Sequence, residues 1–348
     1  MSRLHHLDYL RGIAAAGIML FHFFTWTFGE FDSSSFFGRV GLYGVAIFYV
    51  LSGLTLYHVY HYGMSLSANG IRDFFIKRVF RIFPLMWVAT LFSIWLVKGF
   101  DVSVRQMILN FSGLFGFVAW DEGIATGIWS IGNELVFYCL FPFLIFIGRK
   151  SWWMNVLVLL LFLAIYLWFA FSLLNGDTGF DAPMQKFHYV NPLNQAFLFV
   201  SGFMLGRFIE LPAKPEVKFH VFTIAGLLLF ILYPIHGDRI LLVTDWNRVV
   251  LTASCLMICY GIYRAGGELR GKAHWMLKTL GEISFSVYLL HPIVHRLIGL
   301  FRDAVAPGLS EKFRFIAALV LTLVVSYISY HAFERWFIRL GKRLSNTL

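Results

Sequence analysis

Long apolar segments separated by short polar connectors are the dominant pattern of this chain. Ten segments are long and apolar enough to be membrane-spanning helices, because the hydrocarbon core of a bilayer needs about 20 consecutive apolar residues. Residues 98–126 are only moderately apolar, and we interpret them as a lumenal or extracellular loop with a short interfacial or re-entrant helix. The predicted spans are residues 10–28, 40–62, 82–97, 127–147, 154–174, 192–209, 219–235, 247–264, 280–300 and 314–333.

Composition and charge support this interpretation. Hydrophobic residues make up 59% of the 348 residues and charged residues 14%, and the mean hydropathy is +0.71. Placing both termini in the cytoplasm puts 19 of the 29 Lys and Arg residues on the cytoplasmic side, as the positive-inside rule expects. The net charge of +10 is therefore a topology signal and not a sign of nucleic-acid binding. Counting residues 98–126 as a full span would place Arg149 and Lys150 outside, and we favour the loop.

We therefore predict an all-α polytopic membrane protein of about ten transmembrane helices with both termini cytoplasmic. Residues 1–348 would form a single transmembrane domain without an additional soluble domain. The three cysteines lie inside predicted spans, which fits neither a disulfide framework nor a metal-ligand spacing.

The first predicted span carries a cation at its start and a histidine in its interior. Arg11 and His22 are eleven residues apart, so on a helix they share a face and differ in depth by roughly 16 Å. Arg11, with Asp8 beside it, would suit a topology anchor at the cytoplasmic edge. A histidine inside the bilayer is costly unless it faces a polar interior, so His22 is the first candidate for a functional residue.

A second candidate site lies in the basic segment of residues 71–81. Arg78 and Arg81 are three residues apart and can converge on one anion from a helix. Pro84 would then allow a sharp entry into the third span. Four cations in this connector are also an ordinary topology signal. Because paired guanidinium groups bind phosphates, we expect a phosphate-bearing cytoplasmic cofactor or a lipid headgroup here.

The fourth predicted span carries an acid. Ser130, Glu134 and Tyr138 share one face at four-residue spacing, and Glu134 is the one carboxylate that we place inside a span. Its depth is close to that of His22. A carboxylate in the bilayer needs a partner, and the candidates are His22 and an arginine.

The ninth predicted span contains His291 at a similar depth, followed by Pro292. The alternative role for His291 is to cap a carbonyl freed by a proline kink. In the second span, Ser52 and Gly53 predict close helix packing rather than chemistry.

Taken together, these motifs resemble the acyltransferase-3 family of integral membrane acyltransferases. The resemblance extends over nearly the whole chain, in the family's order, through Arg11-x10-His22, FYVLSG, Arg78-x2-Arg81-Ile-x-Pro, GIWSIGNELVFY and SFSVYLLHP. It implies ten spans, both termini inside, a cytoplasmic acyl-CoA donor and an acceptor hydroxyl that is usually on an extracytoplasmic glycan. It also implies that Arg11, His22, Arg78 and Arg81 are functional residues. Some relatives carry an extra extracytoplasmic hydrolase-like domain.

The expected chemistry is acyl transfer from acetyl-CoA without a tightly bound cofactor or a metal. Arg11, Arg78 and Arg81 would bind the phosphates of the donor. His22 would act as general base on the acceptor hydroxyl, oriented or charged by Glu134 or His291. A transient acyl-histidine is the alternative mechanism.

Two functions of other classes compete with this one. A proton-coupled secondary transporter would also use intramembrane His and Glu, but we find no symmetry between halves of the chain. A non-catalytic scaffold would need neither side chain. We expect the protein in a bacterial inner membrane, in contact with lipids and with no nucleic-acid partner.

Overall fold

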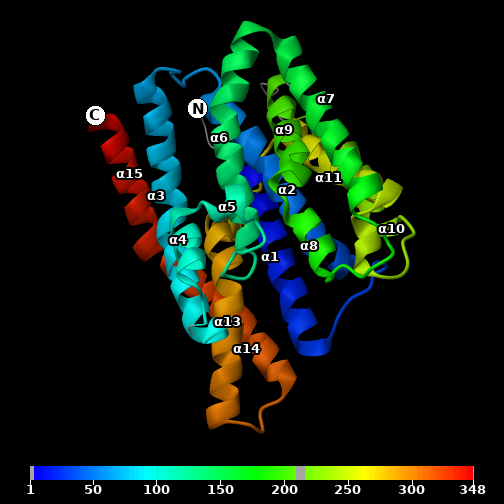
Figure 1. The fold of residues 1–348 in the computed structure, drawn as a ribbon, viewed down its shortest axis with the longest axis vertical. Helices are drawn as coiled ribbons and strands as arrows, with labels where there is room; N and C mark the ends of the chain where they lie inside the picture. The colour runs from blue at the N-terminus through cyan, green and yellow to red at the C-terminus, as the bar shows by residue number, and fades with distance from the viewer. Residues whose placement is uncertain (1–3, 100, 209–215, 348) are drawn as a thin grey trace. The chain divides into compact units, whose positions relative to one another are not determined.

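The described part of the chain, residues 4–99, 101–208 and 216–347 of a computed structural model, is helical and contains no strand (Figure 1). Within these residues, eight helices are long and apolar enough to cross a membrane. The protein is therefore an all-α integral membrane protein. The eight candidates are His5–Phe28, Phe36–Tyr60, Ala68–Leu96, Ile128–Lys150, Trp152–Leu173, Asp245–Ala265, Ser284–Val305 and Glu311–Ser345.

The chain divides into two compact units whose segments alternate along the sequence. Helices α1 (His5–Phe28) and α6 (Ile128–Lys150) each contribute residues to both units. The single transmembrane domain expected from the sequence stays a prediction. Unit 1 comprises Met1–Ile18, Phe31–Gly63 and Val136–Gly281, and unit 2 comprises Met19–Glu30, Met64–Leu135 and Glu282–Leu348.

Unit 1 is built around the contact between α2 (Phe36–Tyr60) and α9 (Pro192–Phe208). A Cβ atom added at Gly53 would lie 2.0 Å from the carbonyl oxygen of Phe199, and one added at Gly202 would lie 1.9 Å from that of Val50. Lipid provides little hydrophobic force between helices, so small residues that allow backbones to touch supply the packing. The predicted close packing at Gly53 is confirmed.

The remaining helices of unit 1 include two segments shorter than a typical span. Helix α9 has 17 residues and α10 has 13. They lie where hydropathy predicts the spans 192–209 and 219–235. Helix α10 ends before Pro234, and Arg39 donates to the terminal carbonyls of Phe230 (2.7 Å) and Tyr233 (2.7 Å). The other helices are α7 (Trp152–Trp168), η2 (Phe169–Leu173), α8 (Pro183–Val190), η3 (Val217–Phe219), α10 (His220–Leu232), η4 (Arg239–Leu242), α11 (Asp245–Ala265) and α12 (Gly271–Glu282).

In unit 2, α3 (Ala68–Ser93) packs against α13 (Ser284–Val305), which in turn packs against α14 (Glu311–Ile328) (Figure 1). The prediction that a basic segment, residues 71–81, is separate from a span that begins at about residue 82 is wrong. Residues 71–81 and the span form one helix that continues into η1 (Ile94–Lys98), with Pro84 buried inside it. Proline is tolerated inside membrane helices because neighbouring groups can satisfy the freed carbonyl.

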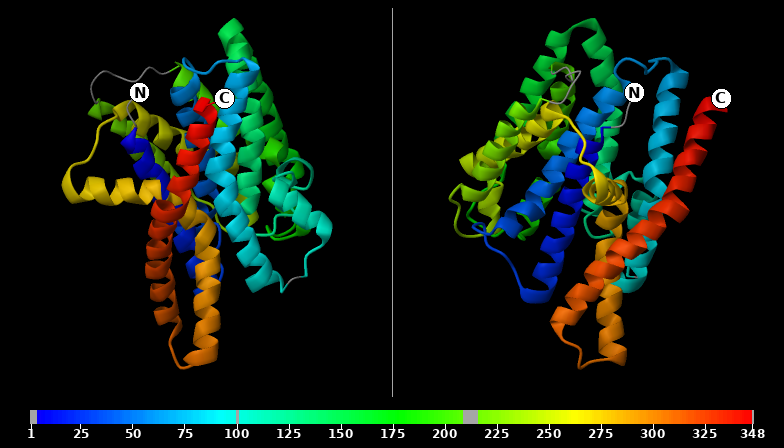
Figure 2. Two further views of the ribbon diagram at one scale, coloured as in Figure 1. Left: turned by 90° about the vertical axis from the view of Figure 1, so that its left-hand side faces the viewer. Right: turned by 180° about the vertical axis from the view of Figure 1, so that it is seen from behind.

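The C-terminal segment corrects a second boundary. Helix α14 continues through the π-helical turn η5 (Ser329–Glu334) into α15 (Arg335–Thr347), so the predicted basic tail is an extension of the last span. Helices α15 and α3 lie side by side (Figure 2). Hydropathy fell at Glu334 because of its charge, although the backbone stays helical.

Residues 98–126 contain the short helices α4 (Val104–Ser112) and α5 (Phe115–Val118). Neither is long enough to cross a bilayer, which agrees with the prediction of a loop containing a short helix. Helix α5 touches α6, because a Cβ atom at Gly116 would lie 2.4 Å from the carbonyl oxygen of Gly132.

Candidate active site

Two histidines predicted to lie at similar depth are in direct contact in unit 2. His22 is half-buried on α1 and His291 is buried on α13, with 1% of its surface exposed. Their Nδ1 and Nε2 atoms, respectively, are 2.9 Å apart. A hydrogen bond between two neutral imidazoles, or between one neutral imidazole and one imidazolium, is a favourable way to hold both rings inside a membrane protein.

The hydrogen bonds of His291 determine where both rings carry their protons. His291 Nδ1 lies 2.9 Å from the carbonyl oxygen of Val287, which can only accept, so Nδ1 of His291 is protonated. In the neutral ring Nε2 is then an acceptor, and His22 must donate to it from Nδ1. His22 Nε2 is therefore the unprotonated, basic nitrogen of the pair.

Aromatic rings hold the plane of His22. The indole of Trp26, one helical turn further along α1, stacks on the His22 ring with centroids 4.9 Å apart and planes 4° apart. Trp26 also contacts His295, one turn after His291 on α13, with centroids 5.2 Å apart. His295 Nε2 lies 3.4 Å from the hydroxyl of Thr27.

Sequence reasoning missed Trp26 and His295. The signal was present, because each lies four residues after a histidine that was singled out and therefore shares its helix face.

The N-terminal end of α6 is attached to the same part of α13. The hydroxyl of Tyr288 lies 2.7 Å from the Ser130 hydroxyl and 2.9 Å from the carbonyl oxygen of Gly127, which also accepts from Ser130 at 3.0 Å. The ring of Tyr288 is 6.3 Å from that of His291. Glu134 is half-buried and within electrostatic range of Tyr288.

The structure thus brings Ser130, Glu134 and His291 into one neighbourhood of unit 2, with Tyr288 as the link. Sequence reasoning did not assign Tyr288 a role. It lies three residues before His291, on the same face of α13.

Three predicted site residues belong to unit 1. Arg11 donates to Asp8 Oδ1 at 3.2 Å and to the hydroxyl of Thr55 at 3.2 Å. Asp8 and Tyr138 are buried. The expected convergence of Arg11 with Arg78 and Arg81 joins residues of different units and stays a prediction.

Arg78 and Arg81 lie on α3, in unit 2. Arg78 is half-buried with its guanidinium carbon 5.6 Å from the centroid of the Phe74 ring, and Arg81 is exposed. Arg81 is within electrostatic range of Glu334, a buried carboxylate that accepts a hydrogen bond from the Ser286 hydroxyl.

The view that Glu134 is the one carboxylate inside a span is therefore wrong. Glu334 lies within the continuous helix Glu311–Ser345 and is 5% exposed. The sequence indicates a basic tail here because four cations follow Glu334 within nine residues.

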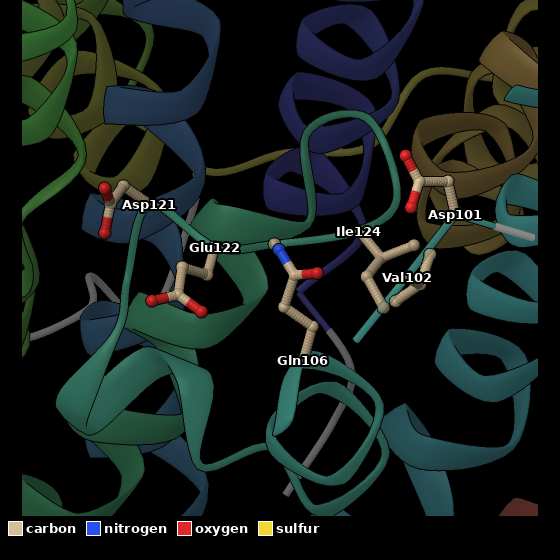
Figure 3. Close-up of a pocket in the computed structure, with 7 residues that line it drawn as sticks. Asp101, Val102, Gln106, Asp121, Glu122 and Ile124 are labelled. Atoms are coloured by element: carbon tan, nitrogen blue, oxygen red, sulfur yellow. The ribbon is translucent and has the colours of Figure 1, made fainter. Parts of the chain in front are cut away.

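A separate polar cavity of about 180 Å³ lies among residues of the loops around α4 (Figure 3). The carboxylates of Asp101, Asp121 and Glu122 line it together with Gln106. Arg105 forms an ion pair with Glu122, and this hydrogen bond raises the pKa of Arg105. An acidic lining is unsuited to a phosphate-bearing donor.

Within residues 4–99, 101–208 and 216–347 there is no group of three or more His, Cys, Asp or Glu side chains that could hold a metal ion. The side chains gathered around His22 and His291 can exchange protons and form hydrogen bonds. Their chemistry is that of general acid–base or nucleophilic catalysis.

Comparison with known proteins gives one family and two relatives. The model of the acyltransferase-3 family, described as an acyltransferase domain, matches residues 4–331. The chain is 21% identical over 361 residues to the "Putative peptidoglycan O-acetyltransferase YrhL" of Bacillus subtilis (strain 168), covering 94% of this chain and 54% of that protein. It is 24% identical over 299 residues to the "Putative acetyltransferase ORF330" of Acidianus two-tailed virus, covering 83% of each. The chain thus spans about half the length of the Bacillus relative. No solved structure matches it significantly.

Proposed function

Because this chain belongs to the acyltransferase-3 family, we propose that it transfers an acyl group from cytoplasmic acyl-CoA to a hydroxyl of a cell-surface or lipid-linked carbohydrate. It is a membrane acyltransferase, and acetyl-CoA is the donor that we propose. The observation that carries the proposal is the His22–His291 hydrogen bond, which leaves the basic nitrogen of His22 at Nε2. The name of the Bacillus relative, a peptidoglycan O-acetyltransferase, supports a glycan acceptor.

In the proposed reaction, Nε2 of His22 takes the proton of the acceptor hydroxyl as its oxygen attacks the thioester carbonyl. The new carbon–oxygen bond forms, the carbon–sulfur bond breaks, and the departing thiolate of CoA takes the proton back from His22. While His22 is an imidazolium, its Nδ1–H···Nε2 bond to His291 becomes charge-assisted and stronger. His291 therefore stabilises the transition state more than the ground state.

The same tautomer also supports nucleophilic catalysis. His22 Nε2 would attack the thioester carbonyl and expel the CoA thiolate, which takes one proton from the imidazolium and leaves an acyl-histidine. The acceptor hydroxyl then attacks the acyl carbon, and its proton returns to the imidazole as the carbon–nitrogen bond breaks. Ping-pong kinetics distinguish this route from direct transfer. In both, Glu134 and Tyr288 would orient groups around the reacting centre.

The donor site in this proposal is built on Arg78 and Arg81 of unit 2, and a role for Arg11 in donor binding stays a prediction from the sequence. Guanidinium groups bind phosphates through short, charge-assisted hydrogen bonds. Replacing Arg78 or Arg81 with Gln should raise the KM for acetyl-CoA with less effect on kcat. An unchanged KM would remove that residue from the donor site.

The catalytic assignment is tested with His22→Ala in membranes that contain the protein, using radiolabelled acetyl-CoA and envelope glycans as acceptor. We expect loss of label transfer with normal insertion. His236→Ala is the matched control, because His236 is exposed in a connector outside the candidate spans. Retained turnover in His22→Ala would contradict the catalytic assignment of His22. Label crossing proteoliposomes without appearing in glycan would favour the transporter alternative.

A further inference from the structure

The two helices that carry most of the cations of unit 2 lie against each other. A Cβ atom added at Gly341 of α15 would lie 2.6 Å from Cβ of Phe80 on α3, so the helices touch at this point. They run antiparallel, as Figure 1 and Figure 2 show. The sequence alone predicts a phosphate site in residues 71–81, on α3, and a basic tail in the residues of α15.

Both helices are longer than a membrane span requires. The continuous helices Ala68–Leu96 and Glu311–Ser345 have 29 and 35 residues, whereas about 20 residues cross the hydrocarbon core. The four cations of Ala68–Leu96 lie in its first half, and four of the six cations of Glu311–Ser345 lie in its last eleven residues, on α15. Because the helices are antiparallel, these two ends belong to the same end of the pair.

Helix geometry places four of these cations on one side of the pair. Arg81 follows the contact residue Phe80 on α3, and Lys342 follows Gly341 on α15, so each is turned by about 100° from the contact. In antiparallel helices, these equal turns point to the same side. Lys77 precedes Arg81 by four residues and Arg339 precedes Lys342 by three, and residues at these spacings share a helix face. We name Lys77, Arg81, Arg339 and Lys342 the α3–α15 cationic face.

Among the described residues, Glu334 is within electrostatic range of Arg81, and the other three cations of the face have no carboxylate partner. Arg81, Arg339 and Lys342 are exposed and Lys77 is half-buried. The described residues give no carboxylate partner to Lys77 or Lys342. Arg339 donates to the carbonyl oxygen of Arg335, one turn earlier on its own helix.

Four cations on adjacent helices repel one another, and a polyanion removes that repulsion. From this arrangement we infer that α15 supplies the second half of the donor site, with Arg339 and Lys342 binding phosphate groups of CoA beside Lys77 and Arg81. The inference rests on the proposed function for its choice of CoA. An anionic lipid headgroup offers the same phosphate chemistry, and the experiment separates the two sources.

The test compares two lysines of the same continuous helix. Lys342→Gln removes a cation from the face, whereas Lys312→Gln removes an exposed lysine at the opposite end of the helix Glu311–Ser345. Binding of CoA to the purified full chain in neutral-lipid nanodiscs is measured by calorimetry. We expect Lys342→Gln to raise the Kd for CoA. The double variant Arg339→Gln/Lys342→Gln should raise it roughly tenfold at low salt, and this increase should become smaller as salt is added. Lys312→Gln should bind as the wild type does.

Acyl transfer provides a second readout. The double variant should raise the KM for acetyl-CoA and leave kcat nearly unchanged, because the reacting groups are untouched. Unchanged CoA affinity in a double variant with wild-type thermal stability would overturn the inference while leaving the proposed function standing. Weakened binding to phosphatidylglycerol vesicles with unchanged CoA affinity would assign the face to lipid and also overturn it. Absence of CoA binding by the wild type would overturn the proposed function itself.

Discussion

The hydrogen bond between His22 and His291 gives the sharpest quantitative prediction. Replacing His291 with Leu removes the nitrogen that accepts from His22 Nδ1 but fills a similar volume in a site that is 1% exposed. The Val287 carbonyl, which His291 Nδ1 also contacts, keeps its place in the helix of α13. The change is therefore directed at the pair and not at the fold.

The magnitude follows from the charge on His22 during the reaction. A hydrogen bond to a charged group contributes about 1.5–3 kcal/mol. Each 1.36 kcal/mol of transition-state stabilisation corresponds to about tenfold in rate, so kcat should fall by about 10- to 150-fold in His291→Leu. The KM for acetyl-CoA should change little, because the donor phosphates are bound elsewhere.

His291→Gln is the matched variant, because a Gln side chain can place its amide oxygen near the position of Nε2 and accept from His22. It should recover a large part of kcat. The assay is steady-state transfer of radiolabelled acetyl to envelope glycan, with thermal unfolding of each variant as the control. Wild-type kcat in His291→Leu, or equal losses in the Leu and Gln variants, would refute the role given to the hydrogen bond.

Three further changes test the site and the packing that supports it. Tyr288→Phe removes the hydroxyl that contacts Ser130 and should lower kcat by about 3- to 10-fold in the same transfer assay; an unchanged rate would exclude the link from catalysis. Gly53→Val places side-chain atoms where the Phe199 carbonyl lies and should destabilise unit 1 by about 3 kcal/mol, seen as a lower Tm; wild-type stability would contradict the backbone contact. Arg39→Met leaves the terminal carbonyls of α10 without their donor and should lower the free energy of unfolding by about 3 kcal/mol, seen as a lower Tm; wild-type stability would contradict this role of Arg39.

Hydropathy predicted the membrane class and most helices, because burial in lipid demands long apolar helices whatever their packing. It placed the ends less well where charge and helix coincide. Residues 71–81 and Glu334 read as connectors because they are charged, yet the backbone is helical through both. A charged helix that extends beyond the hydrocarbon has the same hydropathy as a loop.

The candidate site was predicted as single residues and not as contacts. Depth along a helix follows from residue spacing, so His22, Glu134 and His291 were expected at similar heights. Which helix faces they occupy depends on packing between segments more than 100 residues apart, and spacing contains no such information. The tautomer of His22 required the contact between His291 and Val287, which only the structure provides.

The central claim is that His22 is the proton acceptor or nucleophile of an acyl transfer. Its most direct test is the purified protein in nanodiscs with radiolabelled acetyl-CoA and isolated envelope glycan, with labelled ester quantified by mass spectrometry for wild type and His22→Ala. Ester formation by the wild type and none by His22→Ala, with equal thermal stability, is the result that we predict. Equal ester formation by both proteins would contradict the account.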